Sequence, residues 1–370
     1  MAYNWQQDDW PNFRYDLSTV EETLLTFAEK TGRASGLLKG LTAETQTEAM
    51  IEMMVAEAVK TSEIEGEYVS HKDVMSSIRN NLGLGLPAEP VTDKRAEGAA
   101  ALMLDVRSSF TEPLTEETLF AWHRMIMTGS QRVKVGQWRR HAEPMQVVSG
   151  PVGKPTVHFE APPSSRVPKE MTQFIAWFNK TAPGGMQEIK RPVVRAAVVH
   201  LYFESIHPFE DGNGRIGRAL SEKALSQGTG RPMLLSLSRT IEAHRKDYYK
   251  ALQTGQQSNE ITAWVTWFVK MAVEAQEFAE EQIEFTLKKT KFFDRLTAEV
   301  NERQLKVMRR MLEEGPEGFE GGMNAKKYMA ITHASKATAT RDLQDLVEKG
   351  ALVPSGGGRS TRYELKLGGY

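Results

Sequence analysis

The residues best suited to chemistry lie close together, in the run HPFEDGNGRIGR between positions 207 and 218. His207 is a side chain that can accept a proton near neutral pH. Asp211 offers the hard carboxylate oxygen that Mg²⁺ on a phosphate prefers. Its loop is glycine-rich and leads into a helix, where outward-pointing N–H groups and the helix dipole favour anions. Arg215 and Arg218 are three residues apart, so they lie on one face of the first helical turn.

This combination of residues indicates a reaction at phosphorus. Two arginines beside a loop of backbone amides suit a polyphosphate better than a single carboxylate. The run therefore holds a base, a metal ligand and a phosphate-binding loop, as phosphoryl or nucleotidyl transfer requires. The simpler alternative is a glycine-rich turn with a capping histidine and solvated arginines. Each residue alone is more often found in that role, but the whole set in this order favours transfer.

The run 207–218 matches the Fic family motif HPFx(D/E)GNGRxxR position for position. The chain resembles that family from about residue 45 to about residue 260. The resemblance implies a protein adenylyltransferase, which transfers AMP from ATP to a Ser, Thr or Tyr hydroxyl of a target protein. It implies that His207 deprotonates this hydroxyl and that Asp211 holds Mg²⁺. The implied nucleotide-binding residues are Gly212, Asn213 and Gly214 in the anion hole, Arg215 on the inner phosphates, Arg218 on the γ-phosphate, and Ile216 and Gly217 between them.

Gly214 bears on which group is transferred. Relatives that resemble the Doc toxin kinases carry lysine at this place, so the chain is more similar to the enzymes that donate AMP. The loop contacts phosphates rather than the base, so transfer from UTP or GTP stays open as an alternative.

A second segment, from Thr61 to Gly66, resembles the family's inhibitory motif (S/T)xxxE(G/N). Gly66 suits the position after a helix C-terminus, so we expect the helix to end at Glu65. A carboxylate there opposes the helix dipole and needs a cation or a role. The resemblance implies that Glu65 pairs with Arg218 and displaces the γ-phosphate. A solvated glutamate is the simpler alternative, and removal of AMP by a water held on Glu65 also stays open.

A predicted β-hairpin at 146–159 resembles the flap that covers the site in this family. An extended segment of the target protein would pair with its edge. The flap residues are Val147, Val148, Ser149 and Gly150. Tyr248 and Tyr249 resemble the aromatic pair near the adenine in relatives, and Gln256 stands where some relatives have Asn. The simpler alternatives are a surface hairpin without function and an aromatic pair in the core.

Helical periodicity over most of the chain predicts a mainly α protein with a Fic-type helical core. The run 192–206 is apolar nearly all round, so it should be a buried central helix. Further helices are predicted at 20–39, 43–65, 116–127, 168–179, 263–279 and 280–302. The expected segments are a helical N-terminal region (1–45), a Fic core (46–275) that includes the inhibitory helix 46–66, a connecting helix (276–300) and a C-terminal domain (301–370).

Residues 301–370 have the pattern of a winged helix-turn-helix domain. Helices are expected at 305–312 and 324–329, and Ser335 should cap a third. Two short strands around a glycine-rich turn after residue 351 predict the wing. Thr338, Thr340 and Arg341 could face a DNA groove. From Lys291 onward, however, fourteen Lys and Arg oppose eleven Asp and Glu. This excess is too small to predict DNA binding, so docking to a protein is an equal alternative.

The composition limits the remaining classes. The net charge of −1 gives no whole-protein field that attracts nucleic acid or an anionic membrane. The absence of cysteine excludes disulfides and thiol nucleophiles. We see no leader and no run of eighteen apolar residues, so we expect a cytoplasmic protein with no membrane partner. The alternative function is a DNA-binding transcriptional regulator in which the Fic-like domain senses nucleotide, and a homodimer stays open.

Overall fold

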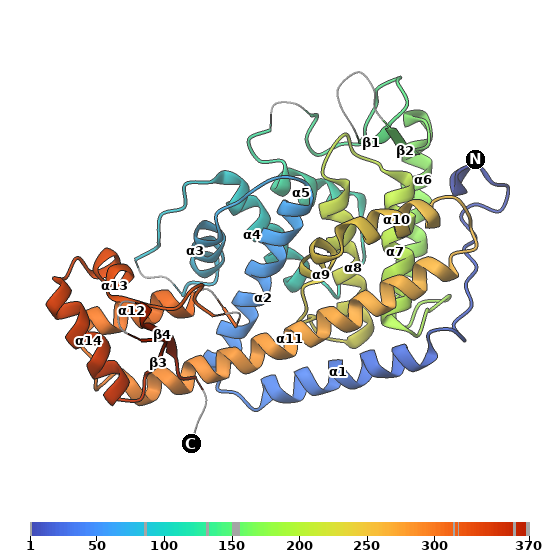
Figure 1. The fold of residues 1–370 in the computed structure, drawn as a ribbon. Helices are drawn as coiled ribbons and strands as arrows, with labels where there is room; N and C mark the ends of the chain where they lie inside the picture. The colour runs from blue at the N-terminus through green and yellow to red at the C-terminus, as the bar shows by residue number, and fades with distance from the viewer. Residues whose placement is uncertain are drawn as a thin grey trace. The chain divides into compact units, whose positions relative to one another are not determined.

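The computed structural model is mainly α-helical, as predicted, with two short β-hairpins (Figure 1). It describes residues 2–84, 87–130, 133–149, 156–313, 315–316, 318–357 and 360–367, so the predicted flap residue Gly150 lies outside the described residues. The strands are β1 (Gln146–Ser149), β2 (Thr156–Glu160), β3 (Leu352–Ser355) and β4 (Arg362–Leu365). The helices are α1 (Glu21–Lys39), α2 (Ala43–Ile64), α3 (His71–Asn81), α4 (Lys94–Ser108), α5 (Glu116–Ile126), α6 (Val167–Lys180), α7 (Pro192–Ile206), α8 (Asn213–Thr229), α9 (Leu237–Ala243), α10 (Arg245–Gly255), α11 (Thr262–Leu296), α12 (Glu302–Leu312), α13 (Ala325–Thr332) and α14 (Lys336–Glu348), with 3-10 helices η1 (Asn4–Gln6) and η2 (Ser164–Arg166).

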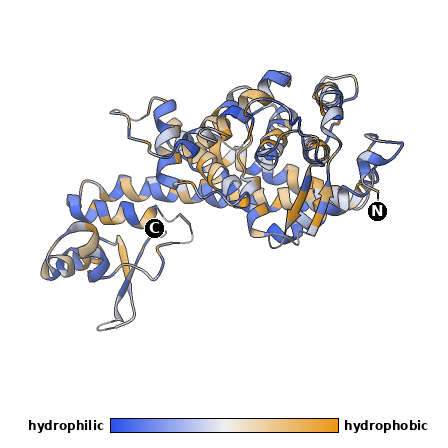
Figure 2. Ribbon diagram, turned by 90° about the horizontal axis from the view of Figure 1, so that it is seen from above, coloured by the Kyte–Doolittle hydropathy of each residue, from blue (hydrophilic) through white to orange (hydrophobic). Residues whose placement is uncertain are grey.

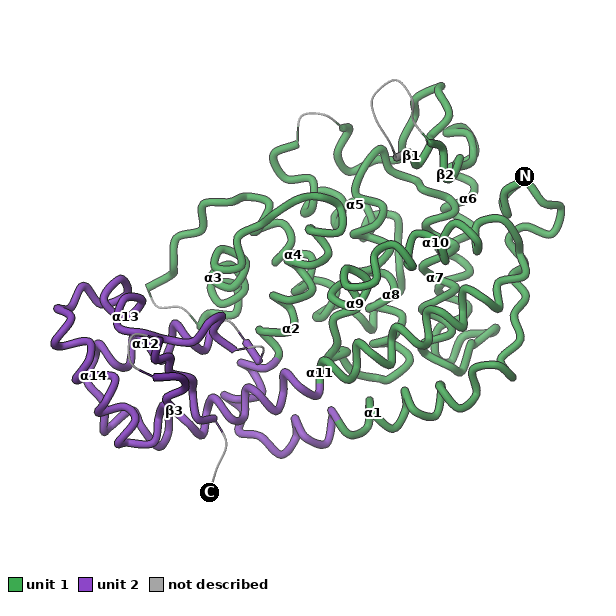
Figure 3. The backbone as a smooth tube through the Cα atoms, viewed as in Figure 1, with its two compact units in different colours: residues 1–33, 50–279 green, residues 34–49, 280–370 purple. Residues whose placement is uncertain are grey.

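The chain forms two compact units, coloured separately in Figure 3. Unit 1 holds residues 1–33 and 50–279, and unit 2 holds residues 34–49 and 280–370. Most helices carry both hydrophobic and hydrophilic residues (Figure 2), as expected for helices that bury one face. The four-segment division of the chain stays a prediction.

Helix α7 is the central element of unit 1, as its all-round apolar sequence predicts. Every residue from Val193 to Ile206 is buried, and α8 packs along it. Full burial of an aliphatic side chain contributes about 1.5–3 kcal/mol. Helix α7 is therefore a rigid support for the residue that follows it, His207.

The N-terminal segment is bonded to the same end of α7, and its aromatic residues pack on the core. The Asn4 amide donates to the Ser205 hydroxyl at 2.8 Å, and the Asn4 backbone N–H donates to the Gln256 carbonyl at 2.8 Å. The Trp10 ring meets the Tyr202 ring edge to face, with centroids 5.1 Å apart. These contacts restrain the last turn of α7.

The predicted helix positions are largely confirmed, with two kinds of difference. The runs 263–279 and 280–302 form one continuous helix, α11, which ends at Leu296 rather than at 302. Helices α3, α4, α9 and α10 were not predicted. Helix α9 has seven residues and α4 is rich in alanine, so the apolar pattern of these two is weak.

Unit 2 contains three short helices followed by a hairpin, which is the order expected for a winged helix. The Ser335 hydroxyl accepts from the Thr338 N–H and caps α14, as predicted. Strands β3 and β4 pair antiparallel, with Leu352 opposite Leu365. Between α12 and α14, the buried Gln304 amide donates to the Asp342 carbonyl at 3.0 Å.

Candidate active site

The loop between α7 and α8 holds His207 in an uncommon backbone conformation. His207 ends α7 with φ 50° and ψ 61°, in the left-handed region. Residues held there often belong to functional sites. Gly212, with φ 81°, is the N-cap residue directly before α8. Between the two, the Asn213 amide bonds both the N–H and the carbonyl of Phe209 at 2.9 Å, which closes the loop on itself.

Two residues outside the motif fix this loop, and the sequence did not identify either as part of the site. The buried Arg139 donates to the His207 carbonyl at 2.7 Å. His123 stacks on Phe209 with centroids 4.1 Å apart. Burial lowers the pKa of His123 to about 4, so its ring is neutral at pH 7. Its Nδ1 accepts from the Gly136 N–H at 2.8 Å, so Nε2 carries the proton that bonds the Asp211 carbonyl at 3.2 Å.

Both motif arginines are buried, with exposures of 3% for Arg215 and 1% for Arg218. Arg218 donates from Nε to the Thr61 hydroxyl at 2.7 Å and from Nη2 to the Glu65 carboxylate at 2.7 Å. Burial acts to lower the pKa of Arg218, but the pairing with Glu65 raises it above its ordinary value. Arg215 donates from Nη1 to the Glu67 carboxylate at 2.7 Å. The predicted Glu65–Arg218 pairing is thus present in the structure.

Gly214 lies directly beneath Glu65. A Cβ atom at this position would collide with a carboxylate oxygen of Glu65 and lie 3.1 Å from Arg218 Nη1. The absence of a side chain therefore lets the end of α2 approach the first turn of α8. Gly217 is packed as closely on the other side, where a Cβ would lie 2.6 Å from a carboxylate oxygen of Glu204. Ile216 is wholly buried in the core between them.

Glu204, which the sequence reading did not single out, faces the candidate base. Its Oε2 lies 3.5 Å from His207 Nδ1, one helical turn earlier on α7. Burial acts to raise the pKa of Glu204, but its interaction with His207, with smaller effects from His200 and Arg218, holds that pKa below its ordinary value. The i, i+3 spacing on a predicted helix could have identified Glu204.

A cavity of about 680 Å³ opens at this site. It is lined by Glu65, Gln146, Val147, Val148, His158, Phe159, Glu204, His207, Gly214, Arg245, Lys246, Tyr248, Tyr249, Lys250, Leu252, Gln253 and Gln256. The cavity thus brings the candidate base His207, the valines of β1 and Glu65 together. Asp211 lies in the adjoining loop with its side chain 55% exposed. Asp211 Oδ1 lies 3.9 Å from Arg215 Nη2.

The two predicted adenine-side tyrosines differ in their surroundings. Tyr248 is buried, and its hydroxyl bonds His200 Nε2 at 2.9 Å, so it belongs mainly to the core. Tyr249 is 40% exposed and lies beside Arg245, whose guanidinium is 5.9 Å from the ring centroid. The cations Arg245, Lys246 and Lys250 on α10 also line the cavity and were not predicted, because no motif contains them.

Flap strand β1 pairs antiparallel with β2, which confirms the predicted hairpin. Val147 lies opposite Phe159, and the register shifts between Val147 and Val148. Ser149 ends the strand. The hairpin has two strands, so one edge of β1 carries no strand among the described residues.

Three family models match the chain. Residues 113–225 match the Fic/DOC family, residues 3–84 match a domain of unknown function, DUF4172, and residues 320–366 match the C-terminal domain of the transcriptional regulator DIP2311-like. The first of these segments contains the motif, the loop and its support on α7.

The chain contains a Fic domain.

Curated proteins similar to this Fic protein carry matching names. "Protein adenylyltransferase Fic" of Nematostella vectensis is 28% identical over 143 residues, which cover 38% of this chain and 29% of that protein. "Protein adenylyltransferase Fic" of Aedes aegypti is 32% identical over 89 residues, 24% of this chain and 16% of that protein. The chain thus matches less than a third of the length of either relative.

Solved structures of Fic proteins share the fold. A Fic family protein from Desulfovibrio desulfuricans G20 matches with a TM-score of 0.56 at 20% identity, covering 97% of this chain and 99% of that one. Fic-1 from C. elegans matches with a TM-score of 0.52 at 18% identity, over 74% of each chain. The predicted fold class, mainly α with a Fic-type core, is confirmed. No helix among the described residues is both long and apolar enough to cross a membrane.

Proposed function

We propose that this Fic protein is an autoinhibited protein adenylyltransferase, which transfers AMP from ATP to a hydroxyl of a target protein and of itself. The observation that carries the proposal is a single cavity that holds His207, the Gly214 turn of α8 and the Glu65 that occupies Arg218. The names of the relatives support the reaction class.

In the proposed step, the target hydroxyl oxygen forms a bond to the α-phosphorus of ATP. The bond from this phosphorus to the oxygen bridging to the β-phosphate breaks, and pyrophosphate leaves. The hydroxyl proton passes to His207. Glu204 Oε2 lies 3.5 Å from His207 Nδ1, and a carboxylate there favours a proton on that nitrogen, so we propose Nε2 as the acceptor. The Glu204 carboxylate then stabilises the imidazolium that forms.

The Asp211 carboxylate suits Mg²⁺ on a nucleotide. Its side chain is 55% exposed, and among the described residues no set of three His, Cys, Asp or Glu side chains forms a metal cage. Mg²⁺ in nucleotide sites is held by one or two carboxylates together with substrate phosphates, so a single exposed carboxylate fits. When bound, Mg²⁺ would neutralise phosphate charge, and Asp211 would be its protein ligand.

The first turn of α8 would hold the phosphates. Gly212, Asn213 and Gly214 place backbone N–H groups at a helix N-terminus, which favours anions. Arg215 would bind the inner phosphates and Arg218 the γ-phosphate. Because Arg218 is bonded to Glu65, we propose that the γ-phosphate competes with this carboxylate. Removal of AMP by a water held on Glu65 remains the reverse activity to be tested.

The target protein would bind at the flap. The free edge of β1 near Val147 and Val148 lies at the same cavity as His207, so an added strand would carry its hydroxyl to the base. Tyr249 would lie on the adenine side. The identity of the target is left to experiment.

Intact-mass analysis after incubation with ATP and Mg²⁺ tests this function. We expect Glu65→Gly to gain AMP on itself faster than the wild type. When two groups compete in this way, the presence of one typically changes the affinity for the other by about 5- to 150-fold. The double variant Glu65→Gly/His207→Ala should gain AMP about 10²–10⁴-fold more slowly than Glu65→Gly. Equal AMP incorporation by wild type and Glu65→Gly would contradict autoinhibition, and no AMP on any form or on added cell proteins would contradict the reaction.

A second candidate function concerns residues 301–370. The match of residues 320–366 to a transcriptional regulator domain favours DNA binding. Lys336, Thr340, Arg341 and Gln344 are exposed on α14, the helix that would enter a groove. We propose that this helix binds DNA. An Arg341→Ala variant should weaken DNA binding in a mobility-shift assay with genomic fragments, whereas a shift identical to the wild type's would argue against α14 as the reading helix.

A further inference from the structure

The end of α2 places a second carboxylate on the phosphate-binding arginines. Glu67 Oε2 accepts from Arg215 Nη1 at 2.7 Å, the same distance that joins Glu65 to Arg218. Two acidic residues, two positions apart, therefore each occupy one arginine of the motif. The inhibitory motif contains Glu65 only, so its resemblance gives Glu67 no role.

We infer that Glu67 is a second inhibitory residue, which competes with the inner phosphates of the nucleotide for Arg215. The inference rests on the proposed function for the ligand class, a nucleoside di- or triphosphate. Glu67 would therefore weaken the binding of ADP as well as of ATP, because both nucleotides carry the inner phosphates. Glu65, by contrast, competes only with the γ-phosphate.

The backbone at the end of α2 explains why both carboxylates reach α8. The Gly66 N–H bonds the Glu63 carbonyl at 3.0 Å, and the Glu67 N–H bonds the Ser62 carbonyl at 2.9 Å. This pair of bonds, with Gly66 at φ 79°, is a Schellman motif. It turns the chain sharply after Glu65, so that Glu65 and Glu67 both face the first turns of α8.

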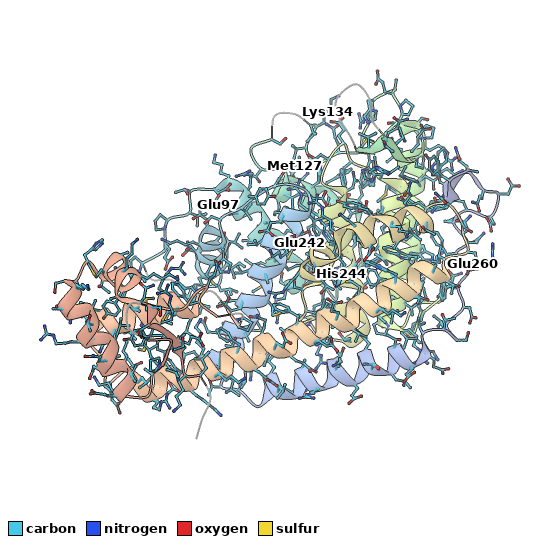
Figure 4. All side chains as sticks on the ribbon, viewed as in Figure 1. Glu97, Met127, Lys134, Glu242, His244 and Glu260 are labelled. Carbon is cyan, nitrogen blue, oxygen red and sulfur yellow. The ribbon has the colours of Figure 1, made fainter. Side chains whose placement is uncertain are left out.

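The surroundings of Arg215 show why Glu67 matters to it. The guanidinium is 3% exposed, and its other close acceptors are the Ile126 carbonyl at 3.4 Å and the Met127 sulfur at 3.5 Å. Met127, labelled in Figure 4, follows the end of α5. Among the described residues, Asp211 is the other carboxylate within 4 Å, at 3.9 Å. Glu67 is thus the main counter-charge of a buried cation.

Both arginines also retain capacity for a ligand. Arg215 Nε and Arg218 Nη1 are buried and have no hydrogen-bond partner in the part of the chain that the structure describes. A buried donor without a partner is unfavourable, so an incoming phosphate oxygen would satisfy it. Glu67 is 30% exposed and Glu65 is 28% exposed, so either carboxylate can turn into solvent when a phosphate replaces it. The site therefore allows a phosphate to replace the carboxylate on each of the two arginines.

Nucleotide binding measured by titration calorimetry separates the two inhibitory residues. We would compare wild type, Glu67→Gln, Glu65→Gly and the double variant, each with ADP and with ATP in Mg²⁺. Glu67→Gln should tighten both nucleotides on the order of tenfold. Glu65→Gly should tighten ATP and leave ADP within twofold of wild type. Glu63→Gln is the matched control, because Glu63 lies on the same turn but pairs with Lys60 at 2.6 Å.

Thermal unfolding gives a second readout. Without ligand, Glu67→Gln removes the main counter-charge of the Arg215 cation and should melt below Glu63→Gln. ADP should raise the melting temperature of Glu67→Gln more than that of the wild type. ADP affinity of Glu67→Gln within twofold of wild type, in a folded protein whose Glu65→Gly form binds ATP more tightly, would overturn the inference. Tighter ADP binding by Glu67→Gln without AMP transfer by any variant would instead support the inference and reject the proposed reaction.

Discussion

The motif loop and the end of α2 meet at one site but are built in different ways. The loop is closed by its own residues, through the Asn213 amide on Phe209 and the left-handed His207. The end of α2 has an ordinary helix-terminating turn, and its importance comes from what it touches, Arg215 and Arg218. A loop that is closed by its own residues has a recognisable sequence motif. A helix end that acts through contacts with distant residues has a weaker sequence signal.

The sharpest test of the loop is His207→Ala in the Glu65→Gly background. Loss of a positioned base typically costs 10²–10⁴-fold, so we expect AMP transfer to fall by about that factor. ATP affinity should stay within a few-fold by calorimetry, since the arginines are unchanged. His244→Ala is the matched control, because this histidine, which is labelled in Figure 4, is exposed and pairs with Glu274. Transfer retained by His207→Ala would remove the base from the mechanism.

The role of Glu204 can be separated from packing by a pH profile. Glu204→Gln keeps the size of the side chain but removes the charge that stabilises the His207 imidazolium. We expect transfer to fall about tenfold and the acid limb of the rate profile to move to lower pH. A lower rate with an unmoved acid limb would make Glu204 a packing residue only.

Acid should destabilise the folded protein through two buried histidines, one of which, His123, supports the loop. Burial lowers the pKa of His123 and of His200 to about 4 each, from 6.5 when unfolded. The unfolded chain therefore binds more protons between these values, so stability is full above pH 6.5 and is lost as the pH falls toward 4. The slope should approach about 1.4 kcal/mol per pH unit for each histidine.

Urea unfolding at several pH values measures this slope. His123→Gln should flatten the dependence of stability on pH by the contribution of one histidine. An equal slope in His123→Gln and wild type would show that His123 is not neutral and buried in solution.

The smallest expected effect concerns the turn at Gly66. Gly66→Ala forces a side chain into the left-handed region at φ 79°, at a cost of about 1–2 kcal/mol. The variant should melt a few degrees lower. Its rate of AMP transfer should rise in part, because Glu65 and Glu67 lose their fixed positions on the arginines. Gly83→Ala is the matched control, with φ 70° and open space around it, far from the arginines in sequence. Equal melting loss with no gain in transfer would show that the turn does not hold Glu65 and Glu67 in the positions that the proposed inhibition requires.

The sequence by itself determined the mainly α fold, the buried α7 and the run 207–218, because periodicity and a dense local motif are properties of neighbouring residues. It also indicated the Glu65–Arg218 pairing through resemblance. Only the tertiary structure decided which residues support the loop and face its base, namely His123, Arg139 and Glu204. It alone showed Glu67 on Arg215, 148 residues apart in the chain. Such contacts depend on how the helices pack. A single carboxylate or imidazole has no recognisable sequence pattern, because its partner is distant in the chain and is brought close only by folding.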